Sequence, residues 1–203
     1  MFVGNLGILV FPGTLEAAGW ICAMGEPLRS GRMDVTLGVP MKNLRTRKIV
    51  WKSSAAGGGM GGPALAGSLV LVGTEKGTLE AINTATGKTV WSFNAGEAIR
   101  SAPAIGDGIA VVTTMSGKVF AVGLTDGAKK WGREAGSDIK GSVCLSRGYA
   151  FVGTRAGKLL AFHVASGKLA WEENIGEPIE AMPILIDQSL VVCTVKGNLI
   201  VFQ

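Results

Sequence analysis

Histidine and cysteine are scarce in this sequence, and their scarcity limits the metal chemistry that the chain can support. One histidine and three cysteines occur among 203 residues. Cys22, Cys144 and Cys193 form no Cys-x-x-Cys pair, and any disulfide scheme leaves one of them over. A zinc site built from cysteine and histidine is therefore hard to assemble, and we predict no metal site. Because Cys144 and Cys193 lie in apolar segments, we expect both to be small buried hydrophobic residues.

Long apolar runs are missing as well. The opening stretch, residues 1–11, is apolar, but it is shorter than the roughly 20 residues that a transmembrane helix needs. No basic residue precedes it, as one would in a signal peptide. We predict no membrane span and interpret the stretch as one or two strands.

Charge is also low, and it is unevenly distributed. Charged residues make up 17% of the chain, and the net charge is +5. Between Arg29 and Lys52, seven basic residues stand against Asp34, a local charge of +6, so the rest of the chain sums to −1. No aromatic residues alternate with these charges, as a platform for single-stranded nucleic acid would require. We therefore predict no nucleic-acid binding and interpret Arg45-Thr46-Arg47-Lys48 as the solvated side of one strand.

What the sequence has in abundance is a repeat of forty residues. The stretch at residues 81–91 recurs at residues 121–131 and 161–171, and each copy ends in tryptophan. A fixed period of this length is the signature of a repeat architecture. The repeat can be followed over residues 43–203 but not between residues 12 and 42. We predict that residues 1–42 are a degenerate repeat unit or an extension and that residues 43–203 form the repeat domain.

Each repeat contains four short segments that are typical of strands. The second is a nearly continuous apolar run, such as residues 69–72, and runs without polar alternation indicate strands covered on both faces. A turn ending in glycine follows in every copy, and glycine can adopt the positive φ that a tight hairpin requires. Four antiparallel strands in each unit of forty residues make one propeller blade. The sequence therefore predicts an all-β propeller with four-stranded antiparallel blades and about four blades in this chain.

The residues that we single out are structural. A tryptophan at one place in each blade can pack against the next blade and bury on the order of 150 to 250 Å², so we expect inter-blade core positions rather than a ligand platform. We predict no catalytic, cofactor-binding or metal-binding residues. The structural repeat positions are Trp51, Trp91, Trp131, Trp171, Gly77, Gly117, Gly157 and Gly197.

These repeats resemble a known family. The pattern Ala-x-Asn/His-x-x-Thr/Ser-Gly-Lys-x-x-Trp is similar to the tryptophan docking motif of pyrroloquinoline quinone (PQQ) repeat propellers, over about residues 45–203. Residues 61–91 look especially like the C-terminal blades of quinoprotein alcohol dehydrogenases. Residues 11–20 more faintly resemble a stretch of those enzymes that ends in Asn-Trp and helps to hold the quinone, although here Gly19 precedes Trp20. WD-repeat propellers share the period, but the sequence contains no Trp-Asp pair.

The resemblance implies two alternative functions. The first is a non-catalytic binding or scaffold propeller that binds a protein partner or itself, as in the assembly lipoproteins of the bacterial outer membrane. The second is a fragment or relative of a PQQ-dependent dehydrogenase, a family that uses calcium, a catalytic aspartate and often two adjacent cysteines. This chain has no adjacent cysteines. The place in the docking motif that is acidic in the family is occupied in the three copies here by Asn83, Gly123 and His163. We favour the scaffold, with no cofactor, and the resemblance implies an exported or periplasmic protein.

Few residues remain for chemistry. Asp107, Asp126 and Asp187 stand in turn-like contexts, Asp138 is the remaining aspartate of the repeats, and His163 lies at an outer blade position. We interpret Asp107, Asp126 and Asp187 as turn residues and His163 as a structural residue.

The ends of the repeat predict how the propeller closes. Residues 197–203 correspond to the third strand of a blade, and residues 45–51 correspond to a fourth strand. If the two pair, they complete one blade and cover an apolar edge. Pairing within one chain gives a ring of four blades, whereas pairing between two chains gives a homodimer with one eight-bladed ring. We favour the homodimer, because the enzymes that the repeats resemble have eight blades.

Overall fold

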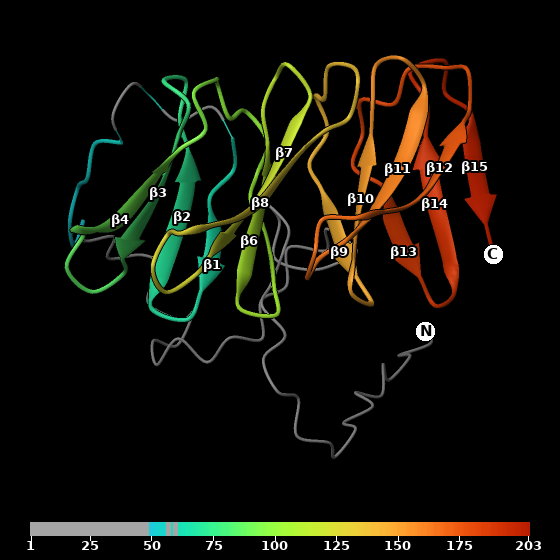
Figure 1. The fold of residues 1–203 in the computed structure, drawn as a ribbon. Coiled ribbons are helices and arrows are strands. Elements are labelled where there is room, and N and C mark those ends of the chain that lie inside the picture. The colour runs from blue at the N-terminus through green and yellow to red at the C-terminus, as the bar shows by residue number, and fades with distance from the viewer. Residues whose placement is uncertain (1–48, 56–57, 59–60) are drawn as a thin grey trace, which may run out of the picture.

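The computed structural model describes residues 49–55, 58 and 61–203, and every regular element in these ranges is a β-strand. The strands form three sheets of four strands and one sheet of three, each in sequential antiparallel order. Figure 1 shows the four sheets side by side in chain order, from the first blade at the left to the last at the right. The prediction of an all-β propeller with about four blades is confirmed.

The blades repeat the same strand lengths. The first contains β1 (Ala64–Ala66), β2 (Leu69–Gly73), β3 (Thr78–Asn83) and β4 (Thr89–Asn94). The second contains β5 (Ala104–Gly106), β6 (Ile109–Thr113), β7 (Lys118–Gly123) and β8 (Lys129–Glu134). The third contains β9 (Cys144–Ser146), β10 (Tyr149–Gly153), β11 (Lys158–His163) and β12 (Leu169–Asn174). The last contains β13 (Ile184–Ile186), β14 (Ser189–Cys193) and β15 (Leu199–Phe202).

Glycine closes the hairpin between the second and third strands of each blade. In the first blade Gly77 has φ of 80°, and its amide donates to the Thr74 carbonyl at 3.1 Å. The equivalent glycines have φ of 91°, 82° and 87°. This left-handed conformation is open to glycine at little cost and is strained for other residues.

A β-bulge recurs where the third strand meets the fourth. In the first blade Ala81 lies opposite Trp91, but Ile82 lies opposite Thr89, so Val90 has no partner of its own. The same shift follows Ala121 and Ala161. A bulge bends the strand and redirects its side chains, and it occurs here beside the repeating tryptophan.

The core lies between blades, so burial depends on how many neighbours a blade has. Four of the five residues of β6 and of β10 are buried, because blades cover both faces of these sheets. In β2 and β14 only two of five residues are buried. The prediction of strands covered on both faces therefore holds for the two inner blades and fails for the two outer ones.

Two further expectations concern single residues and segments. Cys144 and Cys193 are half-buried rather than buried, and no disulfide joins them. Cys22, the opening apolar stretch and the whole of residues 1–42 lie outside the described residues. Within the described ranges, no helix is long and apolar enough to cross a membrane.

Candidate functional site

The repeating tryptophan docks each blade on the next. The Trp91 indole Nε1 donates to the Leu124 carbonyl oxygen at 2.8 Å. The ring also lies against Gly127, where an added Cβ atom would come within 2.7 Å of it. The other two docked rings follow the same pattern. The Trp51 indole Nε1 donates to the Thr84 carbonyl oxygen at 2.7 Å, and its ring lies against Gly87. The Trp131 indole Nε1 donates to the Val164 carbonyl oxygen at 2.6 Å, and its ring lies against Gly167. These contacts join each blade to its neighbour through one hydrogen bond and one close approach that only glycine permits.

Trp171 departs from this pattern. Trp171 is 37% exposed, whereas Trp131 is 6% exposed. The Trp171 ring lies 6.1 Å from Phe151 and 6.3 Å from Phe202, measured between centroids. Among the described residues no carbonyl acceptor is found for its Nε1, unlike those of Trp51, Trp91 and Trp131. Within the described residues Trp171 is therefore not enclosed as Trp131 is.

A groove lies beside Trp171, between the third and last blades. Its volume is about 540 Å³. The apolar lining consists of Trp171, Tyr149, Phe151, Leu185, Leu190 and Phe202. Charged and amide side chains, Glu172 and Gln188 among them, form the rest of the lining. An apolar groove with a polar rim is the usual form of a binding site.

The same end of the molecule carries an open sheet edge. β15 pairs with β14 on one side, and no described strand pairs with its other side. Leu199 is 70% exposed and Val201 is 58% exposed. An apolar strand edge with unpaired backbone groups is a template for another strand. We refer to this side of β15 as the open edge.

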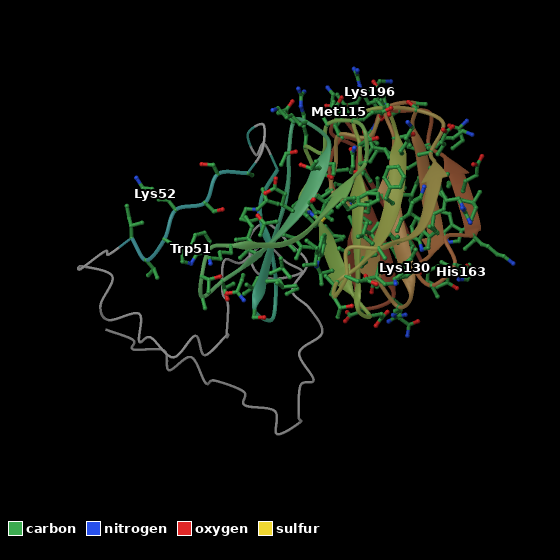
Figure 2. All side chains as sticks on the ribbon, turned by 60° about the vertical axis from the view of Figure 1, so that its left-hand side comes forward. Trp51, Lys52, Met115, Lys130, His163 and Lys196 are labelled. Carbon is green, nitrogen blue, oxygen red and sulfur yellow. The ribbon has the colours of Figure 1, made fainter. Side chains whose placement is uncertain are left out.

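The opposite end of the molecule shows the complementary feature. Residues 49–55, here called the amino-terminal segment, run along the outer side of the first blade without belonging to a sheet. Figure 2 shows Trp51 and Lys52 there. Because Trp51 docks on the first blade as Trp91 docks on the second, the segment occupies the place of a fourth strand. Ile49 and Val50 are 67% and 81% exposed.

Glutamates link the connections between blades to the turns. Glu97 accepts hydrogen bonds from Lys118 Nζ at 2.8 Å, from Thr114 and from Ser116. Glu177 accepts from Thr194 Oγ1 at 2.7 Å and from Asn198 Nδ2 at 2.9 Å. The Lys118 hydrogen bond holds the pKa of Glu97 below its ordinary value, and the Thr194 hydrogen bond does the same for the pKa of Glu177. These carboxylates are therefore engaged in structure.

The two glutamates predict a pH dependence. Because their folded pKa values lie below 4.5, the stability that they contribute is present above that pH and is lost as the pH falls through the folded values. We expect the variant Glu97→Gln/Glu177→Gln to melt at a lower temperature than the wild type near neutral pH. The two melting temperatures should converge between about pH 5 and pH 3. Glu173→Gln is the control, because Glu173 forms none of the ion pairs found among the described residues. A difference between the two melting temperatures that stays constant at all pH values would contradict the stabilising role of the two carboxylates.

The aspartates do not converge on a calcium site. Asp126 Oδ1 accepts from the Ala128 amide at 3.0 Å within its own turn. Asp107 and Asp187 occupy turns of different blades with φ of 50° and 52°, and the carbonyl of Asp138 accepts from the Arg155 amide. No group of three or more His, Cys, Asp or Glu side chains within the described ranges could hold a metal ion. The described residues therefore do not fit the calcium that accompanies PQQ.

His163 stands apart from the glutamates. Figure 2 shows it at the opposite end of the blades from the turn residues Met115 and Lys196. Its ring lies 4.9 Å from that of Tyr149, and its backbone forms both hydrogen bonds of the turn to Gly167 and Lys168. Its contacts are those of a turn residue that packs on its neighbouring strand. Sequence reasoning missed the groove at Trp171.

Comparisons with known proteins agree with this architecture. A family model described as outer membrane protein assembly factor BamB matches residues 39–203. No curated protein matches this chain.

Solved structures share the fold at low sequence identity. BamB from Moraxella catarrhalis is 22% identical, with a TM-score of 0.68, over 75% of this chain and 49% of that one. The computationally designed protein Ika4 is 16% identical, with a TM-score of 0.69, over 77% of this chain and 98% of that one. The quinohemoprotein alcohol dehydrogenase from Comamonas testosteroni is 14% identical, with a TM-score of 0.64, over 72% of this chain and 31% of that one. The match spans about half the length of the BamB chain. Since the family model covers most of the sequence, this chain belongs to the BamB-like family of PQQ-like repeat propellers.

Proposed function

We propose that this chain is a non-catalytic propeller module that binds a protein partner. The observation that carries the proposal is the apolar groove beside Trp171 with its polar rim. Aromatic side chains such as Trp171 and Tyr149, which line this groove, are of the kind that dominates the binding energy of protein interfaces.

The comparisons support the same class of function. The matching family model is named for an assembly factor of the outer membrane, and assembly is a function of protein contacts. We extend this to the chain as a scaffold role in an exported compartment. One partner that would fit is a second copy of this chain, which would give a homodimer with one eight-bladed ring.

The second candidate is quinone binding, which the structural likeness to an alcohol dehydrogenase favours. Its calcium site does not fit the described carboxylates, because Asp107, Asp126 and Asp187 lie in separate turns. We derive no chemistry through the quinone for this reason.

A ligand titration separates the two functions. We expect PQQ with Ca²⁺ to cause no saturable change in quinone absorbance and no rise in melting temperature. A ligand at a hundredfold excess over its Kd stabilises a protein by about 2.7 kcal/mol, which is easily measured. PQQ with Mg²⁺ and Ca²⁺ alone are the controls. A saturable shift that needs both PQQ and Ca²⁺ would overturn the scaffold proposal.

A further inference from the structure

We infer that the outer edge of β4 is a second protein-binding surface, and that it takes an acidic extended segment of a partner with apolar side chains at alternate positions. The inference rests on the proposed protein-binding function. The surface lies on the first blade, whereas the groove at Trp171 lies between the third and last blades, at the other end of the row of sheets in Figure 1.

Each four-stranded blade ends in a fourth strand with an open outer side. β4, β8 and β12 are the last strands of their sheets, and no described strand pairs with their outer sides. Four of the six residues of β8 and two of the six residues of β12 are charged, whereas β4 has no charged residue. Charged side chains protect an edge strand from pairing with another chain. Of the three equivalent edges, β4 is therefore the one that lacks this protection.

The register shows which backbone groups of β4 point outward. The Ala95 amide donates to the Gly77 carbonyl oxygen at 2.7 Å, so these two residues form a hydrogen-bonded pair. Hydrogen-bonded and non-hydrogen-bonded pairs alternate along an antiparallel ladder, so Glu80 and Ser92, which lie opposite each other, form a non-hydrogen-bonded pair. The N–H and C=O groups of Ser92 therefore point away from the sheet, toward an added strand.

Apolar side chains lie beside these backbone groups. Val90, which has no partner of its own at the bulge, is 53% exposed. Trp91 and Phe93 are half-buried. The Phe93 ring packs edge-on against the Phe120 ring of the second blade, with 5.4 Å between the centroids. Exposed aromatic surface of this kind anchors protein interfaces, and an added strand would cover it.

The equivalent seam between the second and third blades is closed by the chain itself. Arg133 stands at the place of Phe93, and its guanidinium donates to the carbonyl oxygens of Gly167 at 2.8 Å and Ser166 at 3.1 Å. Trp131 is 6% exposed there. The first seam has no such clamp, so its aromatic side chains remain open to a partner.

Two lysines set the charge of the segment that this edge would take. Lys88 immediately precedes β4. The Lys129 ammonium lies 5.0 Å from the centroid of the Phe120 ring, beside the aromatic pair. Neither lysine forms an ion pair with any carboxylate of the described ranges. Acidic side chains on the bound segment would complement these two cations.

Hydrogen exchange with two capped heptapeptides tests the inference. The probes are Asp-Val-Thr-Val-Thr-Val-Asp and Lys-Val-Thr-Val-Thr-Val-Lys, used at low ionic strength. We expect the acidic peptide to slow exchange of the Ser92 amide, because an added strand accepts a hydrogen bond from it. The lysine peptide should bind about tenfold more weakly, since it meets two unpaired lysines. The variant Lys88→Glu/Lys129→Glu should reverse this preference.

Proline variants separate strand addition from charge attraction. Ser92→Pro removes an outward N–H that the sheet does not use, so the blade keeps its ladder. This variant should bind the acidic peptide about tenfold more weakly. Glu172→Pro, at the same place of β12, is the matched control and should leave binding unchanged. Melting temperatures show whether both variants fold, and if Ser92→Pro does not, the charge-reversed variant decides.

Four results would overturn the inference. They are slow exchange of the Ser92 amide before any peptide is added, protection of the Gly132 amide of β8 instead, equal binding of the two peptides, and equal losses in the two proline variants. The first would show that the edge is already paired within the chain. Failure at β4 leaves the proposed protein-binding function standing, because the quinone titration tests that function separately.

Discussion

Replacing Trp131 with alanine should lower the free energy of unfolding by about 3 to 5 kcal/mol. The ring is 6% exposed and lies 6.4 Å from the Phe162 ring, between the second and third blades. Its removal leaves a cavity between the blades. It also leaves the Val164 carbonyl without the donor that lies 2.6 Å away, and an unsatisfied buried acceptor adds to the loss. Urea denaturation followed by circular dichroism would measure the change.

Two comparison variants test the cause of this loss. Trp131→Phe retains most of the ring volume but removes the Nε1 donor, so it should cost about 1 to 2 kcal/mol. Trp171→Ala should cost clearly less than Trp131→Ala, because Trp171 is already 37% exposed. Equal losses at Trp131 and Trp171 would contradict the docking account.

Replacing Gly167 with alanine should destabilise the protein by about 2 to 5 kcal/mol, from two additive causes. Gly167 has φ of 65°, which costs a residue with a Cβ atom roughly 1 to 2 kcal/mol. The new Cβ atom would also lie 2.5 Å from the Trp131 ring. Relieving this overlap shifts the indole away from Val164 and costs a further 1 to 3 kcal/mol or so. Thermal unfolding of the purified variant would measure the sum.

Gly176 supplies the matched control. Its φ is 76°, yet nothing lies within 4 Å of the place where its Cβ atom would be. Gly176→Ala should therefore show the backbone cost alone, about 1 to 2 kcal/mol. The difference between the two variants isolates the contact with Trp131. If both variants lose the same stability, the close approach of the ring to Gly167 contributes nothing measurable.

Most of the fold could be predicted from the sequence, because a repeat presents the same local information several times. The turn at Gly77 recurs three more times, and each copy has the positive φ that glycine permits. Apolar runs such as residues 109–112 are strands because they fit between two layers. Hairpins depend on neighbouring residues, so local sequence was sufficient to place their strands and turns.

The glutamate contacts could not be predicted in the same way. Glu97 and Glu177 occupy equivalent places in the repeat, and both accept from the threonine of the turn, but a further partner is Lys118 in one case and Asn198 in the other. These contacts join residues about twenty positions apart. Which side chains meet there depends on how one blade leads into the next, and local patterns do not report it.

The sequence by itself determined the period, the strands, the turns and the identity of the docking tryptophans. Only the tertiary structure decided which of them are buried. Trp131 and Trp171 are identical in the repeat, yet one is enclosed and the other borders a groove. The difference arises because a tryptophan is buried by the Gly and carbonyl of the following blade, not by its own strand. Whether a residue is buried between blades therefore depends on the neighbouring blade, and burial is lower at the ends of the row of described blades.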